Sequence, residues 1–155
     1  MAETPAGMLN SIGLQGPGVE EFIRKDLRWL RERGARTVVS IAGGSVSEFA
    51  ELANRLRHEE GIAAIEVNIS CPNVESRGQV FACDARAAGS VIHAVRRHTS
   101  ALTPIFAKLS PDVTDIADIA RACVTAGGWH HGRLVRTGDS TDGCSVRVAG
   151  PPSTP

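Results

Sequence analysis

The segment Asn68-Ile69-Ser70-Cys71-Pro72-Asn73 has residue types and a spacing that could support chemistry. It places a thiol between two amide side chains, directly after the apolar run 62–67, which predicts a buried strand. Taken alone, a cysteine after such a run is most often a small core residue, because free cysteine is among the most buried residue types. Two amides and a proline turn in the same segment instead favour a polar loop with a fixed direction. Cys71 is therefore a candidate for chemistry.

Polar residues also lie near the ends of two other predicted strands. Ser40 is near the end of the apolar run 37–41, and Lys108 is near the end of the run 104–109. In folds with parallel strands, ligands collect at the carboxyl ends of the strands, so these residues are expected on one rim with Asn68. A lysine at the end of an apolar strand needs a partner unless its side chain reaches solvent, and the sequence leaves both possibilities open.

Three strand and helix pairs in series supply the elements that position these residues. A helical stripe precedes them over residues 19–30 and is closed by Gly34. The stretch Ser45-Val46-Ser47-Glu48 has the capping-box pattern that begins a helix. Continuous apolar strands that alternate with amphipathic helices predict a parallel sheet with both faces covered, so the fold class is α/β. The predicted strands are residues 37–41, 62–69 and 104–109, and the helices that follow them begin near residues 46, 84 and 116.

Composition and charge limit the classes of partner. The chain has 155 residues, is 42% hydrophobic and 22% charged, and balances 17 basic against 17 acidic residues, which is typical of a soluble single domain. No basic cluster alternates with aromatic residues, so no nucleic-acid or membrane surface is expected. No apolar stretch approaches the ~20 residues of a membrane span, and the N-terminus lacks a secretion signal, so the expected location is the cytoplasm.

The cysteine and histidine spacings predict neither a metal site nor a disulfide framework. The four cysteines show no Cys-x-x-Cys pair and no regular spacing. His130 and His131 share a Gly/Arg/Ser-rich stretch with Cys144, but that stretch offers no scaffold for metal ligands. Any reactive thiol in this chain is therefore expected to be a single one, and no metal is expected.

Three motifs, in their order and spacing, resemble the class 1 dihydroorotate dehydrogenase family. They are Asn10-Ser11-Ile12-Gly13-Leu14, the segment from Asn68 to Asn73, and Lys108-Leu109-Ser110-Pro111. The upstream stretch Glu3-Thr4-Pro5-Ala6-Gly7-Met8-Leu9-Asn10 is similar to the type 1B branch, whose catalytic subunit works with a separate iron–sulfur and flavin subunit. The resemblance covers about residues 3–127 and is expected to end there.

The resemblance implies a (β/α)8 TIM barrel as the parent fold, of which this chain holds about three βα units. Three strands cannot close such a barrel, so we expect an internal fragment, with the family's first strand and its flavin phosphate site outside it. Residues 1–127 are expected to form a partial FMN-binding barrel domain. Residues 128–155 have no helical stripe and no likeness to the family, so an irregular tail is expected. Our hypothesis for its origin is a shifted reading frame near Gly127, with a divergent tail as the alternative.

By resemblance, the reaction is the oxidation of dihydroorotate to orotate in pyrimidine biosynthesis, with FMN as the hydride acceptor. Cys71 matches the family's base, which removes a proton from C5 of the substrate. A thiol is largely protonated at neutral pH, so this role requires surroundings that favour the thiolate or a proton relay through a hydroxyl such as that of Ser70. Substrate binding is implied for Asn10, Ser11, Ile12, Gly13, Leu14, Asn68 and Asn73, and cofactor binding for Ser40, Asn68 and Lys108.

One position departs from the family, and several interpretations stay open. Ser40 stands where the family usually has asparagine, and a serine hydroxyl reaches less far toward a flavin.

Two alternatives to an active dihydroorotate dehydrogenase stay open. The chain could be an inactive fragment or an interaction remnant, because open sheet edges favour pairing with another chain. A related flavin barrel that reduces uracil-type rings is a second alternative, although Val74 in place of a histidine favours dihydroorotate. The full-length parent is expected to be an oligomer with an electron-transfer subunit.

Overall fold

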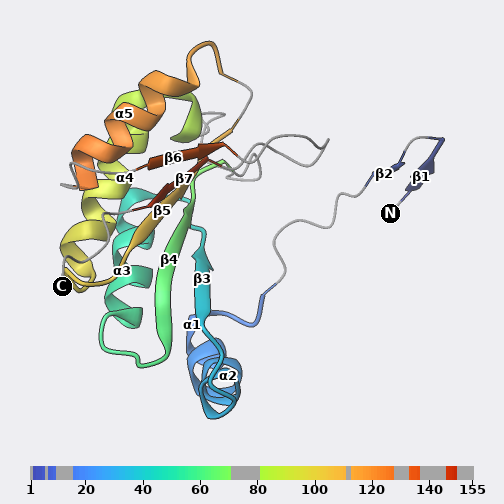
Figure 1. Cartoon of the computed structure of the whole chain (residues 1–155), viewed down its shortest axis with the longest axis vertical. Helices are drawn as coiled ribbons and strands as arrows, with labels where there is room; N and C mark the ends of the chain where they lie inside the picture. Colours follow the sequence, from blue (N-terminus) through green and yellow to red (C-terminus); the bar gives the residue numbers. More distant parts are fainter. Residues whose placement is uncertain are drawn as a thin grey trace.

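A three-stranded parallel sheet is the main element of the fold (Figure 1). The computed structural model describes residues 2–5, 7–9, 16–70, 81–110, 113–127, 133–136 and 146–149. The strand order is β3-β4-β5, and both pairs are parallel. This sheet confirms the predicted α/β class and the three predicted strands, which are β3 (Thr37–Ile41), β4 (Ile62–Asn68) and β5 (Ile105–Lys108).

Helices precede and follow these strands, as the sequence predicts. The stretch before β3 is one continuous helical segment made of α1 (Val19–Glu21), the π-helix η1 (Phe22–Leu27) and α2 (Arg28–Glu32). Gly34 follows it with a φ of 67°, the left-handed conformation that favours glycine at a helix end. The later helices are α3 (Val46–Leu56), α4 (Ala85–His98), which is preceded by the short 3-10 turn η2 (Phe81–Cys83), and α5 (Ile116–Gly127). No helix in the described part of the chain is long and apolar enough to cross a membrane.

Side-chain caps determine where the connecting helices begin. Ser45 Oγ accepts a hydrogen bond from Glu48 N–H at 3.2 Å, and the Glu48 carboxylate accepts one from Gly44 N–H at 2.6 Å. The first bond confirms the predicted cap of α3 at Ser45, whereas the Glu48 carboxylate reaches the N–H of Gly44, one residue before the cap, rather than that of Ser45 itself. α4 begins in a similar way at Asp84, whose carboxylate accepts a hydrogen bond from Ala87 N–H at 2.6 Å. The caps therefore fix the residues at which α3 and α4 begin.

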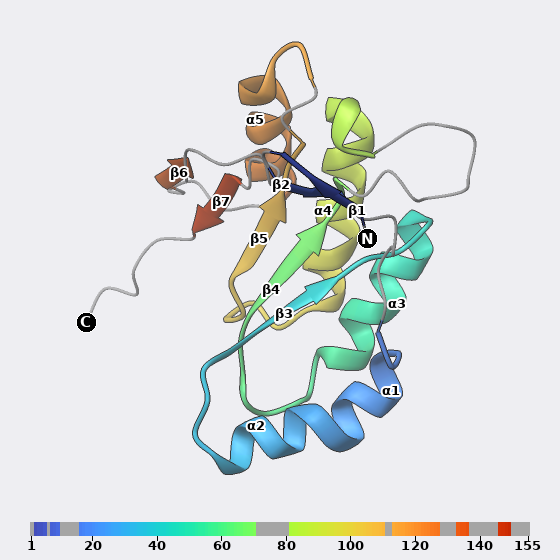
Figure 2. The ribbon, with the colours of Figure 1, turned by 90° about the vertical axis from the view of Figure 1, so that its right-hand side faces the viewer.

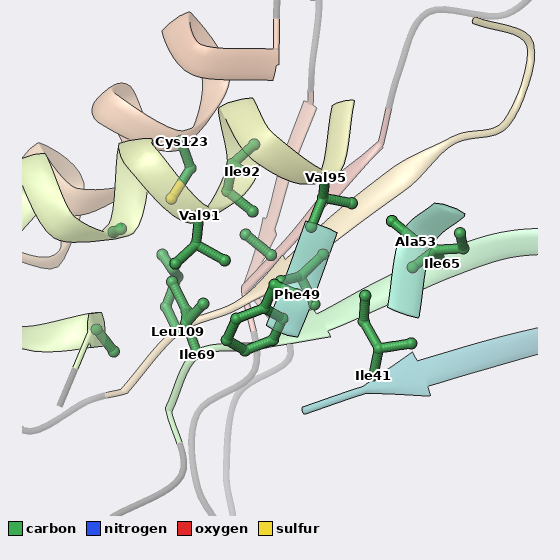
Figure 3. Packing of buried hydrophobic residues seen from close by; sticks show 14 of the residues in the cluster. Ile41, Phe49, Ala53, Ile65, Ile69, Val91, Ile92, Val95, Leu109 and Cys123 are labelled. Carbon is green, nitrogen blue, oxygen red and sulfur yellow. The ribbon is translucent and has the colours of Figure 1, made fainter. Parts of the chain in front are cut away.

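The hydrophobic core lies between the sheet and helices α3, α4 and α5 (Figure 3). Phe49 of α3, Val67 of β4 and Val91 of α4 are each 0% exposed. The ring of Phe49 meets that of Phe81 edge-on, with the ring centroids 6.0 Å apart. Full burial of a side chain of this kind contributes on the order of 1.5–3 kcal/mol. The core therefore decides which side of each strand faces the helices.

The described helices cover one face of the sheet rather than both (Figures 1 and 2). Consecutive strands joined by crossovers of one hand place α3, α4 and α5 on the same side, as in a barrel wall. On the opposite face Val38 is 53% exposed, so the prediction that both faces are covered is wrong for the described residues. We call this second side the polar face, after its residues Ser40, Glu66, Asn68 and Lys108.

Four short strands form two antiparallel pairs outside the main sheet. They are β1 (Ala2–Thr4) with β2 (Gly7–Leu9), and β6 (Arg133–Arg136) with β7 (Val146–Ala149). β7 lies beside β5 in both views (Figures 1 and 2).

The prediction that the tail 128–155 is irregular is wrong for β6 and β7. A strand needs only alternating apolar residues, as in Val146-Arg147-Val148, and a search for continuous apolar runs misses that pattern. The domain boundary between residues 127 and 128 stays a prediction.

Candidate active site

The register of the sheet brings polar residues of three strands onto one face at their carboxyl ends. Asn68 pairs with Lys108 between β4 and β5, and Ser40 pairs with Glu66 between β3 and β4. Side chains that pair across strands, or that lie two residues apart on one strand, point to the same face. Val67, between Glu66 and Asn68, points the other way and is buried against the helices. The sequence-selected residues Ser40, Asn68 and Lys108 therefore share the polar face, while their roles in binding stay predictions.

Asn68 is the buried part of the polar face. Only 6% of this residue is exposed, and Ser70 Oγ donates a hydrogen bond to Asn68 Oδ1 at 3.0 Å. The bond engages the amide oxygen and turns the two Nδ2 donors away from Ser70. It also engages the hydroxyl proton of Ser70. In this arrangement Ser70 orients the amide of Asn68 rather than relaying a proton.

Glu66 is a polar-face residue that the sequence motifs do not single out. Ser40 Oγ donates a hydrogen bond to Glu66 Oε1 at 3.0 Å, and Glu66 is partly buried whereas Ser40 is exposed. Ser40 is expected from the resemblance to contact a flavin directly, but its hydroxyl is bonded to this carboxylate. The signal for Glu66 is present in the sequence, because a carboxylate inside an otherwise apolar strand is rarely buried without a partner.

Lys108 carries the only positive charge among the described residues of the polar face. Its side chain is partly buried, and no ion pair joins its ammonium to a carboxylate in the described part of the chain. Glu66, the carboxylate of the same face, lies two residues before the register partner of Lys108. The ammonium is therefore available to a carbonyl or an anionic group of a ligand.

Several predicted site residues lie outside the described residues, and their roles stay predictions. They are the catalytic candidate Cys71 and the substrate-binding candidates Asn10, Ser11, Ile12, Gly13, Leu14 and Asn73. The structure does show how the chain is held on both sides of Cys71. Ala82 N–H donates a hydrogen bond to Ile69 O at 3.1 Å, and both residues are buried in the core. This bond therefore holds Ile69 and Ala82 together next to Asn68 and Ser70.

Cys123 is a core residue and not a candidate for chemistry. It is 3% exposed and lies among the apolar side chains between α4 and α5 (Figure 3). Burial raises the pKa of the Cys123 thiol to about 12, so the thiol stays protonated at neutral pH. Among the described residues, no group of three or more His, Cys, Asp or Glu side chains is arranged to hold a metal ion.

A hollow of about 330 Å³ lies along the outer edge of β3. Val19 and Phe22 form one of its walls, and Leu52 and Leu56 of α3 form another. The described lining is largely apolar and contains no titratable side chain. Acid–base or charge-stabilising chemistry is therefore expected at the polar face, and the hollow marks an open edge of the sheet.

Comparisons with known proteins agree with the family that the sequence motifs resemble. The family described as dihydroorotate dehydrogenase matches residues 1–149, which extends past residue 127, where the resemblance was expected to end. The chain is 50% identical over 127 residues to the dihydroorotate dehydrogenase B (NAD(+)) catalytic subunit of Solidesulfovibrio magneticus, and 47% identical over 127 residues to that of Geotalea daltonii. Each alignment covers 82% of this chain but only 41% of the relative. The chain belongs to the dihydroorotate dehydrogenase family.

Proposed function

We propose that this chain is part of an FMN-dependent dihydroorotate dehydrogenase and that its polar face forms one wall of the catalytic site. The proposal depends on the pairing of Asn68 with Lys108 at the carboxyl ends of β4 and β5, in a chain of this family. Ligands of parallel α/β folds bind at this end of the strands. Because the chain spans 41% of the length of its relatives, the reaction is proposed for a complete barrel to which these strands contribute.

The side chains of the polar face fit the polar edge of an FMN ring. That edge presents carbonyl oxygens and a ring N–H, so it requires both donors and acceptors. The face offers the ammonium of Lys108, the amide of Asn68 and the hydrogen-bonded pair of Ser40 and Glu66. Asn68 and Lys108 would hold the ring, and the resemblance assigns Ser40 to the same cofactor site. When bound, FMN supplies a hydride acceptor.

The residues of this chain would contribute binding, charge stabilisation and proton transfer. Lys108 would stabilise negative charge on a ring carbonyl, because no described carboxylate pairs with its ammonium. Asn68 would donate from Nδ2, because its Oδ1 accepts a hydrogen bond from Ser70. Cys71 would take the proton from C5 of dihydroorotate. The ureide and carboxylate of the substrate would be bound by the amides of Asn10, Asn68 and Asn73.

We also infer an electron-transfer partner for the complete enzyme. The relatives are named as catalytic subunits, and their names include NAD(+). A second subunit with an iron–sulfur centre and FAD would connect such a catalytic subunit to NAD(+) in an oligomeric assembly.

An inactive or interacting fragment is the alternative that a structural observation favours. In the described sheet β3 is an edge strand, and residues 37–42 line the hollow beside it. Such edges pair readily with other chains. The alternative of a barrel that reduces uracil-type rings is not favoured by any contact of the described residues.

Titration of the purified chain with FMN tests the proposal. We expect the chain to be colourless as purified, because much of the binding energy for FMN comes from a phosphate site formed by later loops of such barrels. Added FMN should still have its fluorescence quenched saturably, and anaerobic dihydroorotate should then bleach the flavin absorbance. A chain that never quenches FMN and elutes as an aggregate would support the fragment alternative.

A further inference from the structure

The Glu66 carboxylate is the only acidic group among the described residues of the polar face. Ser40 Oγ–H is bonded to Glu66 Oε1 at 3.0 Å, and no other described residue forms a hydrogen bond or an ion pair with this carboxylate. A partly buried carboxylate is costly unless its oxygens accept hydrogen bonds. The second oxygen, Oε2, is therefore an acceptor that the polar face presents to a ligand.

Glu66 also occupies the middle of the polar face. It lies on the central strand β4, directly opposite Ser40 of the edge strand β3. On the other side is β5, where Lys108 pairs with Asn68, two residues further along β4 than Glu66. The ammonium of Lys108 and the carboxylate of Glu66 form no ion pair, so each charge can contact a different atom of the same ligand.

The carboxylate of Glu66 is the strongest acceptor among the described site residues. Lys108 can only donate, and the neutral oxygens Asn68 Oδ1 and Ser40 Oγ are each already engaged in one hydrogen bond. The imide edge of a flavin ring has one N–H between two carbonyl groups, so it needs donors for the carbonyls and one acceptor for the N–H. An N–H without an acceptor in a partly buried site would lose the free energy of its hydrogen bond to water.

We propose that Glu66 is a further cofactor-binding residue, whose carboxylate accepts a hydrogen bond from the imide N–H of the flavin. Ser40 is then a positioning residue, which acts through Glu66 rather than by touching the ring. This inference rests on the proposed function, because it assumes that a flavin occupies the polar face. The ureide N–H of the substrate offers the same chemistry, so the test must separate the two ligands.

The test compares lumiflavin, which has the imide N–H but no phosphate, with 3-methyllumiflavin, in which a methyl group replaces that hydrogen. Fluorescence titrations of the full chain are made for the wild type, Glu66→Ala, Glu66→Gln and Ser40→Ala. We expect Glu66→Ala to weaken lumiflavin binding by about tenfold or more, as for loss of a hydrogen bond to a charged group. Glu66→Gln should recover part of the affinity, because an amide oxygen still accepts, and Ser40→Ala should cause a smaller loss than Glu66→Ala. None of the variants should change the weaker binding of 3-methyllumiflavin.

The control variant is Glu51→Gln, which alters an exposed carboxylate of α3 that pairs with Arg55 at 3.6 Å. It should bind both flavins as the wild type does. Equal affinity of wild type and Glu66→Ala for lumiflavin would overturn the inference and leave the proposed function intact. Equal weakening of both flavins would also overturn it, because the lost contact would then not be to the imide N–H. If the wild-type chain binds neither flavin, both the inference and the proposed function fail for this chain.

Discussion

Asn68 and Lys108 are register partners across the parallel strands β4 and β5, on the face of the sheet that no described helix covers. They belong to separate sequence motifs, and the ladder between the strands makes them neighbours. The amide oxygen of Asn68 is engaged by Ser70, so the pair presents mainly donors. A donor pair that includes an ammonium favours carbonyl and anionic groups of a ligand.

Replacing Lys108 should weaken FMN binding without unfolding the chain. The Lys108→Met variant keeps most of the side chain's apolar volume but removes the charge that would face a ring carbonyl. We expect a loss of about tenfold in affinity, measured by quenching of flavin fluorescence. Lys25→Met, which changes an exposed lysine of η1, is the matched control. Equal FMN affinity of the two variants would contradict the role assigned to Lys108.

Removing the Ser70 hydroxyl should destabilise the folded chain. In the Ser70→Ala variant the buried oxygen Asn68 Oδ1 loses its donor, and an unsatisfied buried acceptor costs about 1–3 kcal/mol. Urea unfolding followed by circular dichroism measures this cost. Ser90→Ala is the control, because the Ser90 hydroxyl donates to Arg86 O on an exposed helix surface and its loss should cost little. The prediction fails if both variants unfold at the same urea concentration.

The stability of the chain should fall at alkaline pH because of Cys123. In the unfolded chain this thiol has its ordinary pKa near 9.0, whereas burial raises the pKa to about 12 in the folded chain. The unfolded state therefore releases the thiol proton first. The stability that the protonated Cys123 contributes to the folded chain is fully present below pH 9 and is lost as the pH rises toward 12. At pH 10 the expected loss is roughly 1 kcal/mol.

Urea midpoints at pH 7 and pH 10 test this prediction. The Cys123→Ala variant lacks the buried thiol, so its midpoint should depend less on pH than that of the wild type. Cys83→Ala, which removes an exposed thiol, serves as the control. An identical pH dependence for the wild type and Cys123→Ala would show that Cys123 does not cause the alkaline loss.

Cys71 should be required for substrate oxidation but not for cofactor binding. If it is the base that removes the substrate proton, Cys71→Ala should slow flavin bleaching by dihydroorotate by roughly 10²–10⁴-fold, as for loss of a general base. The affinity for FMN should be unchanged, because the proposed flavin contacts come from other residues. Stopped-flow absorbance of the flavin measures the rate, with Cys83→Ala as the thiol control. Unchanged bleaching in Cys71→Ala would assign the base to another group.

Local sequence patterns were sufficient to predict the strands of the main sheet and the helices that flank them. The capping box of Ser45 and Glu48 predicted the start of α3, and Gly34 marked the end of the preceding helical segment. Both signals depend on contacts within a few residues along the chain, so they can be recognised without knowledge of the fold. The strands β6 and β7 were missed because short alternating strands give a weak signal.

The partners of the site residues could not be recognised in this way. Ser40 was selected as a direct cofactor contact, yet its hydroxyl is bonded to Glu66, a residue that no motif includes. The two residues meet because β3 and β4 pair in one particular register. A shift of one residue in that register would place Glu66 against the helices.

The amino-acid sequence by itself determined the α/β class, the family and the order of strands and helices, because these follow from local periodicity, capping and contiguous motifs. Only the tertiary structure decided that the helices cover one face of the sheet. It also decided that Asn68 pairs with Lys108 across two strands and that Ser40 donates a hydrogen bond to Glu66. These relationships depend on hydrogen bonds between strands that are distant in the sequence. They also depend on the crossovers that place every helix on the same side of the sheet.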